Sequence, residues 1–101
     1  MDPRLELHNL LCSKLGSQNV YFQPPENLKI NYDAIVYSLD GVDQKYADNI
    51  TYSKKRRYLI THIFRNPEND LIYNMTNIEY CRFIRRFVTD NLYHDVYEIY
   101  Y

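Results

Sequence analysis

The pattern of apolar and polar residues begins with a helical period. Four leucines recur at spacings that place them on one side of an α-helix: Leu7, Leu10, Leu11 and Leu15. Asp2 and Pro3 form a helix start signal, because aspartate accepts hydrogen bonds from unpaired amides and proline suits the first helical position. Gly16 suits the left-handed conformation that ends many helices. The pattern predicts a helix over residues 3–15.

A short run of strand-forming residues comes next and ends on two prolines. Val20, Tyr21 and Phe22 all favour strands. Pro24 and Pro25 lack the N–H that a strand donates to its neighbour, so they stop the pairing or hold the chain at a sheet edge. We therefore expect a short strand that turns sharply outward, followed by a semi-rigid connection to about residue 31.

Two further segments are typical of strands, and a polar stretch separates them. Residues 34–39 alternate and end at Asp40-Gly41, a turn-forming pair. Residues 57–65 carry apolar side chains on both faces, which indicates a central strand covered on each side. The polar stretch over residues 42–53 is longer than most connections, so we expect either a β-arm or a functional loop there.

The C-terminal part predicts a second helix and two more strands. Asn66-Pro67 is a helix start signal of the same kind as Asp2-Pro3. Apolar residues then follow at helical spacing, which predicts a helix over residues 67–77. Residues 81–88 fit either a strand or a helical face. A strand is favoured, because Asp90-Asn91 is typical of a hairpin turn and residues 93–101 have the composition of a strand. The predicted fold is a single α+β domain over residues 1–101, in the order α-β-β-β-α-β-β, with a mainly antiparallel sheet packed by two helices.

Composition narrows the class of protein only slightly. The net charge of −1 lacks the basic excess that nucleic-acid binders usually show. Twelve tyrosines suit either strands or a surface that contacts a partner, because the ring is apolar and its tip is polar. Cys12 and Cys81 are too few for a disulfide framework, so we expect reduced, buried thiols. No apolar run is long enough for a membrane span, so we expect a soluble protein made in a reducing cytoplasm.

Signatures of enzyme sites are mostly missing. Gly16 and Gly41 are the only glycines, which excludes a glycine-rich phosphate loop. A metal site can be assembled only across the fold, from Cys12, Cys81, His8, His62 and His94. We therefore expect no catalytic residues, cofactor or metal, with an enzyme built on a noncontiguous site as a minor alternative.

Local charge is more informative than net charge. The loop that follows the second predicted strand is acidic through Asp40, Asp43 and Asp48, whereas two groups of residues are basic: Lys54, Lys55, Arg56 and Arg57, and Arg82, Arg85 and Arg86. Opposite charges suit the packing of copies against one another, although solvated charges give the same pattern. A second alternative is a nucleic-acid-binding sheet face that joins Arg57 and Tyr58 to Arg82 and Arg86.

Short aromatic motifs along nearly the whole chain carry a family resemblance. They are NVYFQPP at residues 19–25, AIVY at 34–37, the strand from Tyr58 to Ile63, DNLYHD at 90–95 and the closing Tyr100-Tyr101. The chain resembles the tail terminators, small tail-completion proteins of tailed bacteriophages. The resemblance implies a virion protein of the neck that forms a ring, a hexamer in that family, on the tail tube. Its implied partners are other copies, the tube protein and a head-closure neck protein, with DNA only as the passing genome and no membrane.

Two alternatives stay open beside that resemblance: a head-closure or adaptor neck protein, and a small nucleic-acid-binding regulatory domain. For a ring subunit we expect contacts between unlike surfaces, with the acidic 42–53 region against Arg82, Arg85 or Arg86. Lys54 to Arg57 suit a lumen that faces DNA equally well. The residues expected at interfaces are Tyr21, Phe22, Asp40, Asp43, Asp48, Lys54, Lys55, Arg56, Arg57, Arg82, Arg85 and Arg86.

Overall fold

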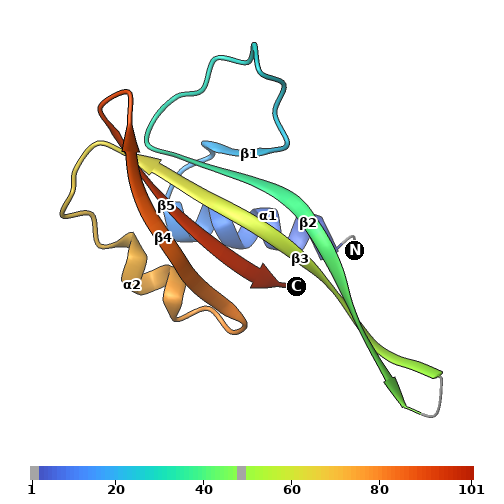
Figure 1. The fold of residues 1–101 in the computed structure, drawn as a ribbon. Coiled ribbons are helices and arrows are strands. Elements are labelled where there is room, and N and C mark those ends of the chain that lie inside the picture. The colour runs from blue at the N-terminus through green and yellow to red at the C-terminus, as the bar shows by residue number, and fades with distance from the viewer. Residues whose placement is uncertain (1–2, 48–49) are drawn as a thin grey trace.

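The computed structural model describes residues 3–47 and 50–101, with side chains described outside residues 3 and 43–55. Within these ranges the chain forms two helices and one five-stranded sheet, which confirms the predicted α+β class and element order (Figure 1). The elements are α1 (Pro3–Leu15), β1 (Val20–Phe22), β2 (Ala34–Ala47), β3 (Ile50–Phe64), α2 (Leu71–Thr76), β4 (Cys81–Thr89) and β5 (Leu92–Tyr100).

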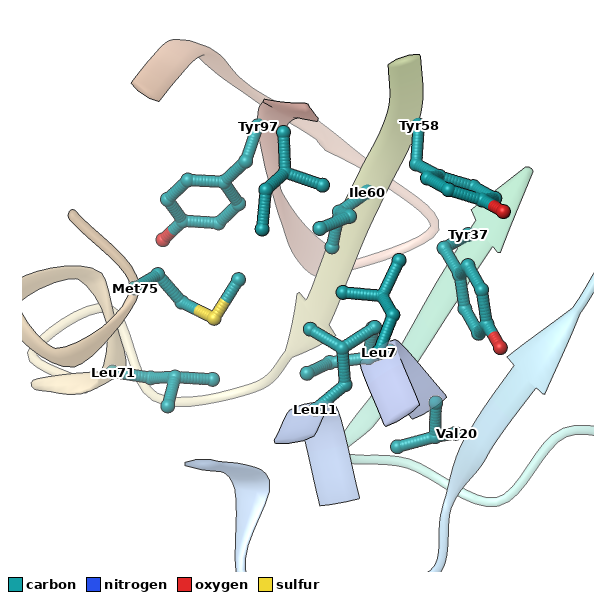
Figure 2. Close-up of a cluster of buried hydrophobic side chains, with 11 residues drawn as sticks. Leu7, Leu11, Val20, Tyr37, Tyr58, Ile60, Leu71, Met75 and Tyr97 are labelled. Atoms are coloured by element: carbon teal, nitrogen blue, oxygen red, sulfur yellow. The ribbon is translucent and has the colours of Figure 1, made fainter. Parts of the chain in front are cut away.

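The sheet has the strand order β1-β2-β3-β5-β4. All neighbouring pairs are antiparallel except β1 and β2, which run parallel. Both helices lie on one face of the sheet, where their apolar residues meet those of the strands (Figure 2). The largest buried members of this core are Leu7, Leu11, Ile35, Tyr37, Tyr58, Ile60, Met75, Tyr97 and Ile99.

α1 ends as the sequence predicts. Gly16 has φ +75° and its N–H donates to the carbonyl of Cys12 at 2.9 Å, which closes the last turn in a left-handed cap. Leu7 and Leu11 are fully buried, whereas Leu10 and Leu15 are half-buried. Asp2, the predicted start residue, lies outside the described residues.

β1 confirms the expected edge strand. It pairs with β2 over residues Val20 to Phe22 only, and the chain then leaves the sheet at Gln23, which has φ +43°. The prolines that follow cannot donate to β2, so pairing ends there. The N–H of Leu39 is bonded instead by the side-chain Oε1 of Gln23 at 3.1 Å.

The second helix is shorter than predicted. α2 begins at Leu71, not at Pro67, because side chains from the preceding turn bond its backbone locally. Asn66 Oδ1 accepts from the N–H of Glu68 at 3.0 Å, and Asn69 Oδ1 accepts from the N–H of Leu71 at 2.9 Å. Such asparagine turns compete with helix formation, so the start signal at Asn66-Pro67 marks a turn.

The C-terminal hairpin confirms the preference for a strand over residues 81–88. Asp90 and Asn91 have φ +54° and +62°, the left-handed pair that a tight hairpin turn requires. A register shift between Phe83 and Arg85 leaves Ile84 as an extra residue in β4. This β-bulge reverses which side chains of β4 point toward the helices.

The central strand is covered on one side only, contrary to the prediction. β3 lies in the middle of the sheet, and its side chains from Tyr58 to Phe64 on the helix side are all buried. On the other side Ile63 is buried, but Leu59 and Thr61 are half-buried. Both helices pack on the first side, so the second side is an open sheet face.

Tyr97 offers a test of the core. Its hydroxyl is buried with no hydrogen-bond partner among the described residues, and burial raises its pKa. An unpaired buried hydroxyl is desolvated on folding without gaining a hydrogen bond in exchange. Tyr97→Phe is therefore expected to raise the free energy of unfolding by about 1 kcal/mol in urea denaturation. Tyr37→Phe is the matched control: that hydroxyl lies 2.8 Å from His8 Nδ1, so its removal is expected to lower stability by about 1 kcal/mol. Equal losses in both variants would contradict the prediction.

Candidate interaction surfaces

The most prominent feature outside the core is a two-stranded arm. The pairing of β5 with β3 ends at Tyr100 and Arg57. Beyond that point β2 and β3 stay paired with each other, from the pair Gly41–Arg57 to the pair Ala47–Ile50. At about 3.3 Å per residue this ribbon adds about 20 Å, and the molecule measures 51 × 26 × 23 Å (Figure 1). We call residues 40–47 and 50–57 the arm. Of the two expectations for the polar stretch at 42–53, the β-arm is the one observed.

An ion pair fixes the base of the arm. The register shifts between Leu39 and Gly41, and Asp40 Oδ2 accepts from Arg57 Nε at 2.9 Å across this bulge. The hydrogen bond from Arg57 to Asp40 raises the pKa of the guanidinium. Gly41 leaves room for this group, because a Cβ there would lie 2.6 Å from Arg57 Nη2. Asp40 and Arg57, both expected at interfaces, thus bond each other within one chain.

The remaining arm residues are placed only in part. Asp43, Lys54 and Lys55 lie on the paired strands of the arm, but their side chains are outside the described part of the structure. Asp48 lies entirely outside the described residues. Arg56 is exposed at the arm base, where its carbonyl accepts from the N–H of Tyr101 at 2.9 Å.

Arg86 is directed into the molecule by the bulge at Ile84. Its Nε and Nη2 donate to the two carboxylate oxygens of Asp95 at 2.5 and 2.9 Å, and the guanidinium lies 5.2 Å from the ring centre of Phe64. The Asp95 side chain is 1% exposed. This bidentate pair is part of the fold and occupies two of the donors of Arg86, whose contact with a neighbouring copy stays a prediction.

The open sheet face carries the other two arginines of β4. Arg82 is 72% exposed and bonds Glu98 at 3.3 Å, a pair of small energetic value. Arg85 lies 5.2 Å from the ring centre of Phe87, which stacks on His94 at 4.7 Å with 11° between the rings. The sequence did not reveal this Arg85–Phe87–His94 stack, because simple alternation without a bulge puts Arg85 on the helix side.

The predicted basic sheet face is consequently divided. Tyr58 and Arg86 point toward the helices, whereas Arg82 pairs across the open face with Glu98. The predicted grouping of Arg57 and Tyr58 with Arg82 and Arg86 is therefore wrong, since adjacent strand residues point to opposite faces. The aromatic residues available beside Arg82 and Arg85 are Phe87 and His94 instead.

Tyr21 and Phe22 on β1 are partly buried and make contacts within the chain. The Tyr21 hydroxyl accepts from the N–H of Asn31 at 3.4 Å, which ties the connection back to the edge strand. Phe22 packs on Tyr37 at 5.0 Å between ring centres, and the Arg4 guanidinium lies 4.6 Å from its ring centre. Phe22 thus has a packing role within the chain, and its place at an interface stays a prediction.

A polar cavity of about 420 Å³ lies between the end of α1, the start of α2 and β3. His62 on β3 contributes to its wall, and both ring nitrogens lack partners among the described residues. Burial lowers the His62 pKa to about 4, so the ring is neutral at pH 7. The other polar residues of the wall are Lys14, Ser17, Asn19, Asp33, Asn69, Asp70 and Asn74.

The cysteines do not add a nucleophile to this cavity. Neither Cys12 nor Cys81 lines it, and both are free and half-buried, not fully buried as predicted. Burial raises the pKa of both thiols, that of Cys81 to about 11, so they stay protonated at neutral pH. His94 and Asp95 are on opposite faces, which leaves no dyad between them.

Within the described ranges, no three histidine, cysteine, aspartate or glutamate side chains gather as metal ligands. The helices described here are also too short and too polar to cross a membrane. Comparison of the chain with protein-family models, with curated proteins and with solved structures found no match.

Proposed function

We propose that this chain is a structural subunit of a phage tail, a tail terminator whose copies form a ring on the end of the tail tube. The observation that carries the proposal is the arm. Its two strands extend beyond the Tyr100–Arg57 pair, where β5 ends and no longer pairs with β3. A ribbon that extends past its own sheet is suited to contact a neighbouring molecule.

Further features support an assembly role. Neither of the helices described lies over the open sheet face, and Leu59 and Thr61 are half-buried there. Three exposed apolar side chains lie on β4, namely Ile84, Phe87 and Val88, at 41%, 37% and 59% exposure. Many small contacts of this kind add up when a subunit repeats around a ring. Ring closure would stop growth of the tube and present a surface to which the filled head attaches.

Electron microscopy of the virus that encodes the chain tests this function. Antibodies against the protein are expected to label purified particles at the junction of head and tail. Deletion of the gene is expected to give tails of uncontrolled length, since nothing would stop polymerisation of the tube. Absence of the protein from purified particles would refute the proposal. Tails of normal length that fail to join heads would assign it to head closure or adaptor function.

The Arg85–Phe87–His94 stack favours one second candidate, a small nucleic-acid-binding domain. Exposed arginines beside aromatic rings on an open sheet are a usual platform for single-stranded nucleic acid. A single-stranded oligonucleotide would then be retained by the protein, and retention would fall steeply with salt. Retention lost in Phe87→Ala, together with absence from particles, would replace the first proposal by this one.

A further inference from the structure

β4 is an edge strand without a partner on its outer side. It pairs with β5 from Cys81 to Thr89, and no strand in the described ranges pairs with its other edge. Ile84 and Val88 on this strand are 41% and 59% exposed. An exposed edge with free N–H and C=O groups is a template for an added strand.

The opposite margin of the sheet has a second unpaired edge. β1 covers β2 only from Ile35 to Tyr37, and the Gln23 side chain bonds the N–H of Leu39. From Asp40 to Ala47, the edge of β2 that faces away from β3 has no partner in the part of the chain described. This second edge belongs to the arm.

The two free edges have directions that match. Strand direction alternates across β2, β3, β5 and β4, so β4 runs antiparallel to β2 within one chain. If a second copy is placed beside the first in the same orientation, its β4 meets the β2 edge of the arm as an antiparallel pair. Such a contact joins unlike surfaces, which is the kind that repeats around a ring.

Charge selects β2 over the other strand of the arm. Residues 38–47 contain Asp40, Asp43 and only one basic residue, Lys45. Residues 50–57 contain four basic residues and no acidic one. Asp40 is held by Arg57 within its own chain, so the first strand offers Asp43 as its acidic residue to a neighbour. β4 contains three arginines and no acidic residue, so the basic second strand repels it and the first does not. Arg82 and Arg85 are exposed and available for attraction to Asp43, whereas Arg86 is held by Asp95.

We propose that β4 of one copy adds as an antiparallel strand to the β2 edge of the arm of its neighbour. This inference rests on the proposed ring assembly and names the surfaces that form the junction. The five-stranded sheet of each subunit then continues into the next. Exposed apolar residues of β4 are covered at the same junction.

Hydrogen exchange on the full chain tests which edges pair. Wild-type protein is concentrated, and monomer and assembled fractions are separated by size-exclusion chromatography with light scattering. Amides of residues 81–89 and 40–47 are expected to exchange at least about tenfold more slowly in the assembled fraction. Rings that form without protection of these two segments would overturn the inference and leave the ring proposal standing. Failure of the wild type to assemble at any concentration, together with unlabelled particles, would overturn both.

Assembly of charge-reversal variants gives a second test of the same junction. Arg85→Glu places an acidic residue on β4, so half-assembly is expected to need about tenfold more protein. The double variant Arg85→Glu with Asp43→Lys is expected to recover most of that loss. Arg65→Glu changes an exposed arginine that lies just past the end of the central strand β3, outside both proposed edges, and it is the control with the same change in net charge. An Arg85→Glu shift no larger than that of Arg65→Glu would refute pairing through β4.

Discussion

Replacement of Arg86 by methionine is expected to lower the free energy of unfolding by about 3–5 kcal/mol. Asp95 is 1% exposed and receives both of its charged hydrogen bonds from Arg86, at 2.5 and 2.9 Å. Without the guanidinium, a buried carboxylate is left with no compensating charge beside it. Domains of this size have a total stability of about 5–15 kcal/mol, so urea denaturation at pH 7 will show a large shift of the midpoint.

Two controls separate the buried charge from the loss of a side chain. Arg82→Met removes an arginine from the same strand, but its pair with Glu98 is exposed at 72% on the Arg82 side. That variant is expected to lose less than about 1 kcal/mol. The double variant Arg86→Met with Asp95→Leu removes both charges and is expected to recover most of the stability. Equal losses for Arg86→Met and Arg82→Met would show that Asp95 finds other compensation.

The elements that pack on the core were predictable from the sequence. Leu7 and Leu11 set the helical period of α1, and Gly16 and Asp90-Asn91 have the positive φ values that their sequence positions indicate. In these places a local signal and the tertiary structure agree. The prolines after Phe22 likewise marked the end of an edge strand.

The arm was not predictable in the same way, for a physical reason. Apolar and polar residues alternate in a strand when one face of the strand packs on a core. The arm extends past the end of β5, beyond the part of the sheet that packs on the core. Residues 42–53 therefore carry no apolar alternation, and only their length signalled an unusual element. Composition alone does not separate a solvated ribbon from a loop.

The directions in which the arginines of β4 point were not predictable, for a different reason. One inserted residue at Ile84 changes the face of every later side chain, so Arg86 turns inward and Arg85 turns outward. No residue type in the segment CRFIRRFVT announces that bulge. The start of α2 was misplaced because asparagine turns at Asn66 and Asn69 bond the backbone before the helix begins.

Stability is expected to fall by about 3 kcal/mol as pH drops from 6.5 to 4, through the single side chain of His62. Burial lowers the pKa of folded His62 to about 4, from an ordinary value of 6.5, while nearby Asp95 and Asp33 offset part of that effect. Between these values the unfolded chain binds a proton that the folded chain does not. Stability therefore rises with pH in this window, and it is fully present above 6.5. Each pKa unit corresponds to about 1.4 kcal/mol, which gives the expected total.

Denaturation at a series of pH values measures this effect, and a variant without the imidazole isolates it. Carboxylates also titrate near pH 4, so the wild-type curve alone does not assign the loss to His62. His62→Phe keeps an aromatic ring beside Phe64, on which His62 stacks at 4.5 Å between ring centres. The difference between the two curves is expected to be flat above pH 6.5 and to slope by up to about 1.4 kcal/mol per pH unit below it. A difference that stays flat down to pH 4 would mean that folded His62 takes up its proton as easily as the unfolded chain does, which would require water or a carboxylate at its ring nitrogens.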